Sequence, residues 1–169
     1  MVLKEIGSKL PTREDSIKAY YETCASRKKF INIDVSEAIL HLEKAKHDLS
    51  RAIKEFEDSC WDWTIIKAYY SIHHAANALL IKKAGMFSKD HICLIVALKH
   101  LGLIPNEFYE ELRKLHSKFS DFTAFEIAYS LRKVSQYDVV KWKELSKEDA
   151  ELVLEFAKKF VKFVEELIA

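Results

Sequence analysis

Histidines and carboxylates lie four residues apart on one predicted helix, and two kinds of metal site can be considered for them. The dipeptide His47-Asp48 occurs in one class of helical phosphohydrolase, which also needs a further His and Asp from other helices. His41 does not meet this need, because it lies on the same helix, about 120° around the axis from His47. Glu37/His41 and Glu43/His47 are spaced four apart, whereas a di-metal helical bundle uses Glu-x-x-His pairs. Such spacing is typical of pairs on a helix surface, so we expect neither a metal nor another cofactor.

His73 is a second candidate for chemistry, because it lies in 62–85, a segment that apolar residues dominate. On a helix, this segment has a broad apolar face, flanked by a stripe that carries His73 and Asn77. Asn77 can satisfy the imidazole as a hydrogen-bonded core pair, and a role of His73 in ligand binding or proton transfer is the alternative. A narrow arc of this helix is expected to face solvent: Lys67, Ser71, His74, Ala78 and Lys82.

The composition predicts an all-α fold. The chain has 169 residues with only three Gly and two Pro, and it is rich in Lys, Glu, Leu, Ala and Ile. This is the length of one ordinary domain with its own core. Lys and Arg total 27 against 26 Asp and Glu, so the net charge of +1 gives no general attraction to nucleic acid or to a membrane. Any anion-binding site must therefore be a local patch.

The sequence also predicts a location and a redox state. No uncharged apolar run reaches about 18 residues, and the first residues lack the apolar core of a signal peptide. We therefore expect a cytoplasmic protein without a membrane span. Cys24, Cys60 and Cys93 are odd in number and lack metal-ligand spacing. We expect them to be reduced and buried as small hydrophobic residues.

Periodicity and capping signals divide the chain into the amphipathic helices of an up-and-down bundle. Gly85 is expected to end the central helix, and Ser88 to cap the next one. Aromatic residues at 119–122 are expected to separate two later helices. Ser146 and Asp149 form a capping box at the start of the last helix. The predicted helices cover about 12–29, 39–56, 62–85, 88–101, 107–119, 123–136 and 146–167.

Three segments of the chain resemble, in order, the motifs of one protein family. They are AYYSIHHAANALL at 68–80, followed by Gly85 and His91, then LRKVSQYD at 131–138, and last the segment 145–163. The first is similar to the AYYAxFHAAxALL…G…H run of the HEPN-domain family of small bacterial and archaeal helical bundles, the second to its L-R-x-x-x-D-Y segment, and the third to its closing helix. The resemblance implies a four-helix core with extra helices.

The resemblance covers 36–169 and leaves 1–35 as an N-terminal helical extension within a single domain, 1–169. It implies a homodimer that binds nucleotide or RNA. Members are often encoded beside a minimal nucleotidyltransferase as half of a toxin–antitoxin pair, so the resemblance implies such a protein as a partner.

Active members of the family are metal-independent ribonucleases with an Arg that is followed, after four to six residues, by a His. By this resemblance Arg132 binds phosphate, but Tyr137 stands where the His is expected, and no His follows His116. A phenol with a pKa near 10 is a poorer proton shuttle at neutral pH than an imidazole with a pKa near 6.5. We therefore expect a binding protein and not an efficient enzyme.

The expected nucleotide- or RNA-binding residues are Arg132, Lys133, Tyr137, His73 and Asn77. Arg132, Tyr137 and His73 are also the candidates for any catalysis. The alternatives are an active ribonuclease toxin and a structural partner that docks on a nucleotidyltransferase.

Overall fold

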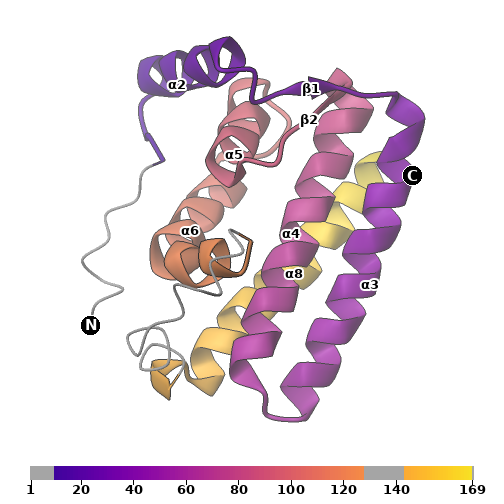
Figure 1. The fold of residues 1–169 in the computed structure, drawn as a ribbon, viewed down its shortest axis with the longest axis vertical. Coiled ribbons are helices and arrows are strands. Elements are labelled where there is room, and N and C mark those ends of the chain that lie inside the picture. Colours follow the sequence, from indigo (N-terminus) through magenta and orange to yellow (C-terminus); the bar gives the residue numbers. More distant parts are fainter. Residues whose placement is uncertain (1–9, 128–142, 169) are drawn as a thin grey trace.

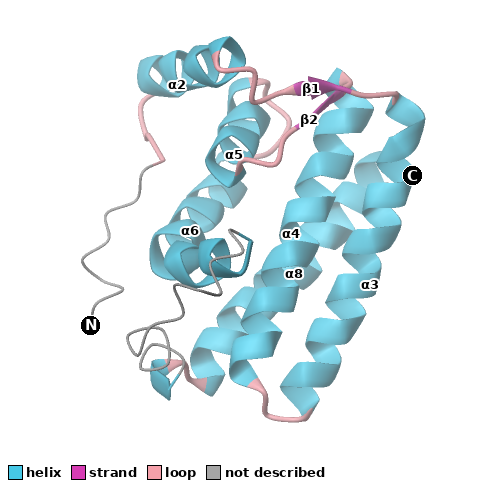
Figure 2. Cartoon of the chain, in the orientation of Figure 1, coloured by secondary structure: helices cyan, strands magenta, loops and turns pink. Residues whose placement is uncertain are grey.

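The computed structural model describes residues 10–127 and 143–168, which form a helical bundle with one short two-stranded ribbon (Figure 1, Figure 2). The all-α prediction is confirmed. In these ranges, no helix combines the length and the hydropathy that a transmembrane span requires. The elements are α2 (Glu14–Ser26), β1 (Ile31–Asn32), the 3-10 helix η1 (Val35–Glu37), α3 (Ala38–Glu57), α4 (Trp61–Ala84), β2 (Met86–Phe87), α5 (His91–His100), α6 (Asn106–Ile127) and α8 (Lys147–Ile168).

Helix α4 lies at the centre of the bundle, with α3 on one side, α5 and α6 on the other, and α8 packed across it (Figure 1). Its apolar face is buried as predicted, and Ile65, Leu79 and Leu80 are each 0 % exposed. Gly85 ends the helix in the left-handed conformation, at φ 66°, which confirms the predicted stop.

The arc of α4 that was expected to face solvent is partly buried against α3. Ser71 and Ala78 are 0 % exposed. The Ser71 hydroxyl donates to the Ala45 carbonyl of α3 at 2.7 Å, and Ala45 is itself fully buried. Small residues at this contact let the two helices approach closely, and the hydrogen bond fixes their register. The sequence pattern of α4 alone did not show where α3 would pack.

Helix α6 runs unbroken from Asn106 to Ile127, so the predicted break at 119–122 is wrong. Phe119 is 0 % exposed and packs inside the bundle. An aromatic residue ends no helix by itself, and no Gly or Pro occurs between Asn106 and Ile127.

The segment before α3 is attached to the connection between α4 and α5 at several points. Strand β1 pairs antiparallel with β2, with Ile31 opposite Phe87. Lys29 Nζ lies 3.8 Å from Asp90 Oδ2, and α2 packs on α5. Asp90, and not the predicted Ser88, caps α5, because its carboxylate accepts the Cys93 N–H at 2.9 Å.

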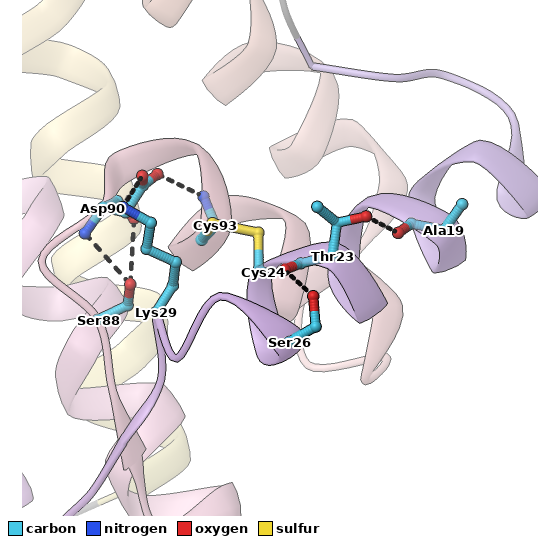
Figure 3. The surroundings of a disulfide bond; sticks show 8 residues. All are labelled: Ala19, Thr23, Cys24, Ser26, Lys29, Ser88, Asp90 and Cys93. Carbon is cyan, nitrogen blue, oxygen red and sulfur yellow. Dashed lines mark hydrogen bonds and ion pairs between the residues drawn. A yellow bond between two sulfur atoms is a disulfide. The ribbon is translucent and has the colours of Figure 1, made fainter.

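A disulfide joins Cys24 of α2 to Cys93 of α5, so the expectation of reduced cysteines is wrong for this pair (Figure 3). Both residues are nearly buried, at 2 % and 4 % exposure. They lie 69 residues apart in sequence and meet because α2 packs on α5, which residue spacing does not reveal. Cys60 is a free thiol.

Helix α8 begins as the sequence predicts. Ser146 N–H donates to the Asp149 carboxylate, and Asp149 N–H donates to the Ser146 hydroxyl, each at 3.2 Å. An aromatic cluster then holds α8 against α6: Phe108 packs edge-on against Phe156 and Phe163.

Candidate functional site

The residues proposed from sequence divide into two groups. Arg132, Lys133 and Tyr137 lie outside the described residues. His73 and Asn77 lie on α4, on the side that faces α5 and the β2–α5 connection. The structure therefore shows the surroundings of the second group only.

Both ends of the Asn77 amide are bonded inside the protein. Its Oδ1 accepts the Ser88 backbone N–H at 2.9 Å, and its Nδ2 donates to the Ser88 carbonyl at 2.9 Å. Nδ2 also lies 3.3 Å from His73 Nε2, so a neutral His73 can accept there. Asn77 is 0 % exposed. These contacts make Asn77 the residue that fastens the β2–α5 connection to α4.

His73 belongs to a stack of neutral aromatic rings between α4, α5 and α6. Its ring centroid lies 4.3 Å from that of His91, which stacks in turn on Tyr69 at 5.3 Å. The Tyr69 hydroxyl lies 3.2 Å from His116 Nδ1. Burial lowers the pKa of His91 to about 4 and holds the pKa of His73 well below its usual value. At neutral pH the imidazoles of His73 and His91 therefore carry no positive charge, and the geometry of their stack suits packing more than anion binding.

A groove of about 430 Å³ lies on the other side of α4, between α4 and α3. We name it the α3/α4 groove. Its walls are two rows of side chains at helical steps of three and four residues. Helix α3 contributes Lys44, His47, Asp48 and Arg51, and α4 contributes Trp63, Ile66, Lys67, Tyr70 and His74.

Asp48 is the acid at the floor of the α3/α4 groove and is only 8 % exposed. Its Oδ1 accepts from Lys44 Nζ at 2.7 Å and lies 3.2 Å from His47 Nδ1. Its Oδ2 lies 3.9 Å from His74 Nε2. Burial lowers the pKa of His74, and the nearby Asp48 charge opposes this shift. The Asp48 carboxylate thus lies beside one lysine and two imidazoles, and the ammonium of Lys44 offsets its negative charge.

Arg51, Lys67 and Trp63 complete the basic and aromatic part of the lining. Lys67 Nζ lies 2.5 Å from Glu55 Oε1 and 5.8 Å from the centroid of the Trp63 ring. The hydrogen bond from Lys67 lowers the pKa of Glu55. Arg51 is exposed and makes no ion pair with any residue in the described ranges. Trp63 is 43 % exposed. The groove therefore combines a guanidinium open to a ligand with a flat ring open to solvent.

Sequence patterns alone did not reveal this groove. His47 and Asp48 were expected at a helix surface, and Lys67 and His74 on an arc that faces solvent. A signal was present, because each helix repeats polar or aromatic residues along one stripe. Only the packing of α3 on α4 shows that the two stripes face each other. Within the ranges that the structure describes, no three His, Cys, Asp or Glu side chains are arranged to hold a metal ion.

Comparison with known proteins agrees with this architecture. A family model described as HEPN domain matches residues 38–167. The chain belongs to the HEPN-domain family. It is also similar to a UPF0332 protein of Archaeoglobus fulgidus, with 31% identity over 127 residues that span 75% of this chain and 91% of the relative.

The HEPN match begins at the first residue of α3. Both walls of the α3/α4 groove therefore belong to the HEPN domain, as does the stack around His73. Helix α2, strand β1 and the disulfide partner Cys24 precede the matched range. The resemblance deduced from the sequence motifs is confirmed at the level of the family.

Proposed function

We propose that this protein binds nucleotide or RNA and that the α3/α4 groove holds the phosphate groups. The observation that carries the proposal is the lining of the groove, in which Lys44, Arg51 and Lys67 accompany one carboxylate, Asp48. Lys44 is paired with Asp48 and Lys67 with Glu55, so Arg51, which has no ion pair among the described residues, leaves this part of a nearly neutral chain with a small positive charge.

The geometry favours phosphate as the anion. Arg51 offers a planar fork of N–H donors, which matches phosphate oxygens, and it has no ion-pair partner among the described residues that a ligand must displace. Lys44 and Lys67 are held in place by Asp48 and Glu55. Their remaining donors can meet further phosphates without a large loss of side-chain freedom. A ligand with several phosphates would therefore use all three cations.

Fluorescence anisotropy with a labelled RNA at low salt tests this proposal. We expect the double variant Lys44→Gln/Arg51→Gln to bind more weakly and to lower the slope of log K against log salt by about two, since each lost phosphate contact lowers it by about one. The control is Lys18→Gln/Lys162→Gln, which removes the same charge from exposed positions on α2 and α8. Equal weakening in both variants would mean that the groove holds no particular phosphate, and no binding by the wild type would refute the function.

The motif segment contributes a further part of the proposal. Arg132, Lys133 and Tyr137 stay predicted ligand contacts, and Tyr137 is the reason why we propose binding without efficient cleavage. In chelator, a nuclease time course on the wild type should show little cleavage, and Tyr137→His should raise it. Robust cleavage by the wild type would favour the active ribonuclease toxin instead.

Partners also belong to the proposal. We propose a homodimer and a role beside a minimal nucleotidyltransferase in a toxin–antitoxin-like system. Apolar side chains near the start of α3 support an association surface: Ile31, Val35, Ile39 and Leu40 are 49 % to 58 % exposed. Light scattering at micromolar concentration should give about twice the monomer mass. A monomer there would refute the homodimer, while co-purification with an adjacent nucleotidyltransferase would test the second partner.

A further inference from the structure

We propose that the α3/α4 groove takes unpaired nucleobases, one of which stacks on Trp63, so that the ligand is single-stranded RNA. This inference rests on the proposed function and deepens it by naming the class of RNA. Phosphate binding alone needs only the cations of the groove. The exposed ring of Trp63 has no part in that binding, and a flat base can stack on it.

Trp63 is placed for such a contact. It lies in the first turn of α4 and is 43 % exposed, although a tryptophan loses free energy by leaving its ring in water. Its neighbour Trp61 is the useful contrast, because it packs on Phe56 at 5.3 Å between ring centroids and takes no part in the groove lining. Two tryptophans two residues apart thus differ in environment, and the open one borders the cations.

The two walls of the groove can contact different parts of a nucleotide. On α3, the cations Lys44 and Arg51 lie seven residues apart, about 10 Å along the helix axis. On α4, Trp63 and Tyr70 lie at the same spacing, with Lys67 between them. A single strand can lay its phosphates along α3 and turn its bases toward α4. Bases stacked on aromatic rings beside a basic track are how proteins hold single strands without sequence preference.

Lys67 can contribute both to phosphate binding and to the stacking of a base on Trp63. Its ammonium lies 5.8 Å from the centroid of the Trp63 ring and is held there by Glu55. This position favours a fixed indole and leaves a cation beside the site where a stacked base would carry its phosphate. A duplex cannot offer this contact, because its bases are already stacked and paired.

The test compares three labelled ligands of equal length on the full chain: a short single-stranded RNA, the same sequence as a duplex, and a ribose-phosphate oligomer without bases. We expect the single strand to bind most tightly. Trp63→Ala should weaken the single strand about tenfold, and Trp63→Phe should restore most of the affinity. Neither change should alter binding of the base-free oligomer. Tryptophan emission should be quenched by the single strand in the wild type and in Trp61→Phe, and much less in Trp63→Phe.

Each outcome separates this inference from the proposed function. If the single strand, the duplex and the base-free oligomer bind equally, and Trp63→Ala changes nothing, stacking is wrong. Phosphate binding still stands in that case, provided that Lys44→Gln/Arg51→Gln weakens all three ligands. If no ligand binds the wild type, both proposals fail. A loss of folding does not confuse the result, because Trp63→Phe and the base-free oligomer report on the intact groove.

Discussion

The two sides of α4 show what the same residue types do in different surroundings. His73 and His74 are adjacent in sequence, yet His73 stacks on His91 within the bundle, and His74 faces Asp48 in the α3/α4 groove. On the α5 side, the Asn77 amide is bonded to the Ser88 backbone and lies within hydrogen-bond distance of His73. On the α3 side, Arg51 and the Trp63 ring remain available to a ligand.

Under the proposed function, the α5 side of α4 stabilises the fold and the α3 side binds the ligand. Substitutions on the first side should therefore change stability, and substitutions on the second should change affinity. A substitution on the α5 side that changes only affinity, or one on the α3 side that changes only stability, would contradict this assignment. Four predictions test it, in order of decreasing effect on stability.

The largest effect should come from the Cys24–Cys93 disulfide on the α5 side. The bond joins positions 69 residues apart. For a loop of this length, the chain-entropy model gives a stabilisation of about 4 kcal/mol. Denaturant unfolding with and without a dithiol reductant measures it directly. The control is Cys24→Ser/Cys93→Ser, which should be equally destabilised and should not respond to the reductant. An unchanged midpoint on reduction of the wild type would show that α2 is held by packing alone.

Acid should destabilise the protein through the buried histidines. The pKa of His91 is about 4 in the folded protein and near 6.5 in the unfolded chain, so below pH 6.5 the unfolded state binds a proton that the native state excludes. The stability from His91 is complete above pH 6.5 and is lost as the pH falls toward 4, by about 3 kcal/mol. Burial is the main cause, the charge of His116 adds to it, and the charge of Asp90 opposes it.

Unfolding curves between pH 7 and pH 4 for the wild type and His91→Phe test this account. Phenylalanine keeps a ring against His73 and Tyr69 but does not titrate, so the acid-induced loss should shrink. His73 shifts in the same direction, so part of the loss should remain. Identical pH profiles would show that His91 is not kept neutral by the fold.

The Asn77 amide should contribute less to the free energy of unfolding than the disulfide does, but more than any surface side chain. Asn77→Ala leaves the buried Ser88 N–H and C=O without their partners, which should cost about 2 kcal/mol. The matched control is Asn32→Ala, at an exposed position on β1, which should stay within about 0.5 kcal/mol of the wild type. RNA affinity measured below the unfolding transition should be unchanged in Asn77→Ala. A loss of affinity without a loss of stability would support the prediction from sequence that Asn77 contacts the ligand.

Local signals were enough to predict much of the fold. The apolar face of α4, the Gly85 stop and the Ser146/Asp149 capping box each depend on residues within a few positions of one another. The disulfide depends on α2 meeting α5, which is a tertiary event. For the same reason, sequence patterns did not show that Ser71 would be buried against α3.

The candidate site was harder to predict, because it is formed by two helices. Family resemblance directed attention to Arg132 and Tyr137, which lie outside the described residues. The polar stripe of α4 directed it to His73, which lies within the bundle. The stripes that form the α3/α4 groove are visible in the sequence only as two separate amphipathic surfaces. The register between Ser71 and Ala45 brings them together.

The smallest effect on stability should come from Arg51, and this makes it the sharpest test of the comparison. Its guanidinium is exposed and forms no ion pair with another residue in the described parts of the chain, so Arg51→Ala should change the free energy of unfolding by no more than about 0.5 kcal/mol. The same change should lower RNA affinity by about 1.5–3 kcal/mol, because a charge-assisted bond to phosphate is lost. Arg51→Lys should recover part of this, since lysine restores the charge but not the planar fork. Opposite results for Arg51→Ala and Asn77→Ala, one losing affinity and the other stability, would separate the two sides of α4. If Arg51→Ala instead unfolds the protein or binds RNA normally, the α3 side is no more a binding surface than the α5 side.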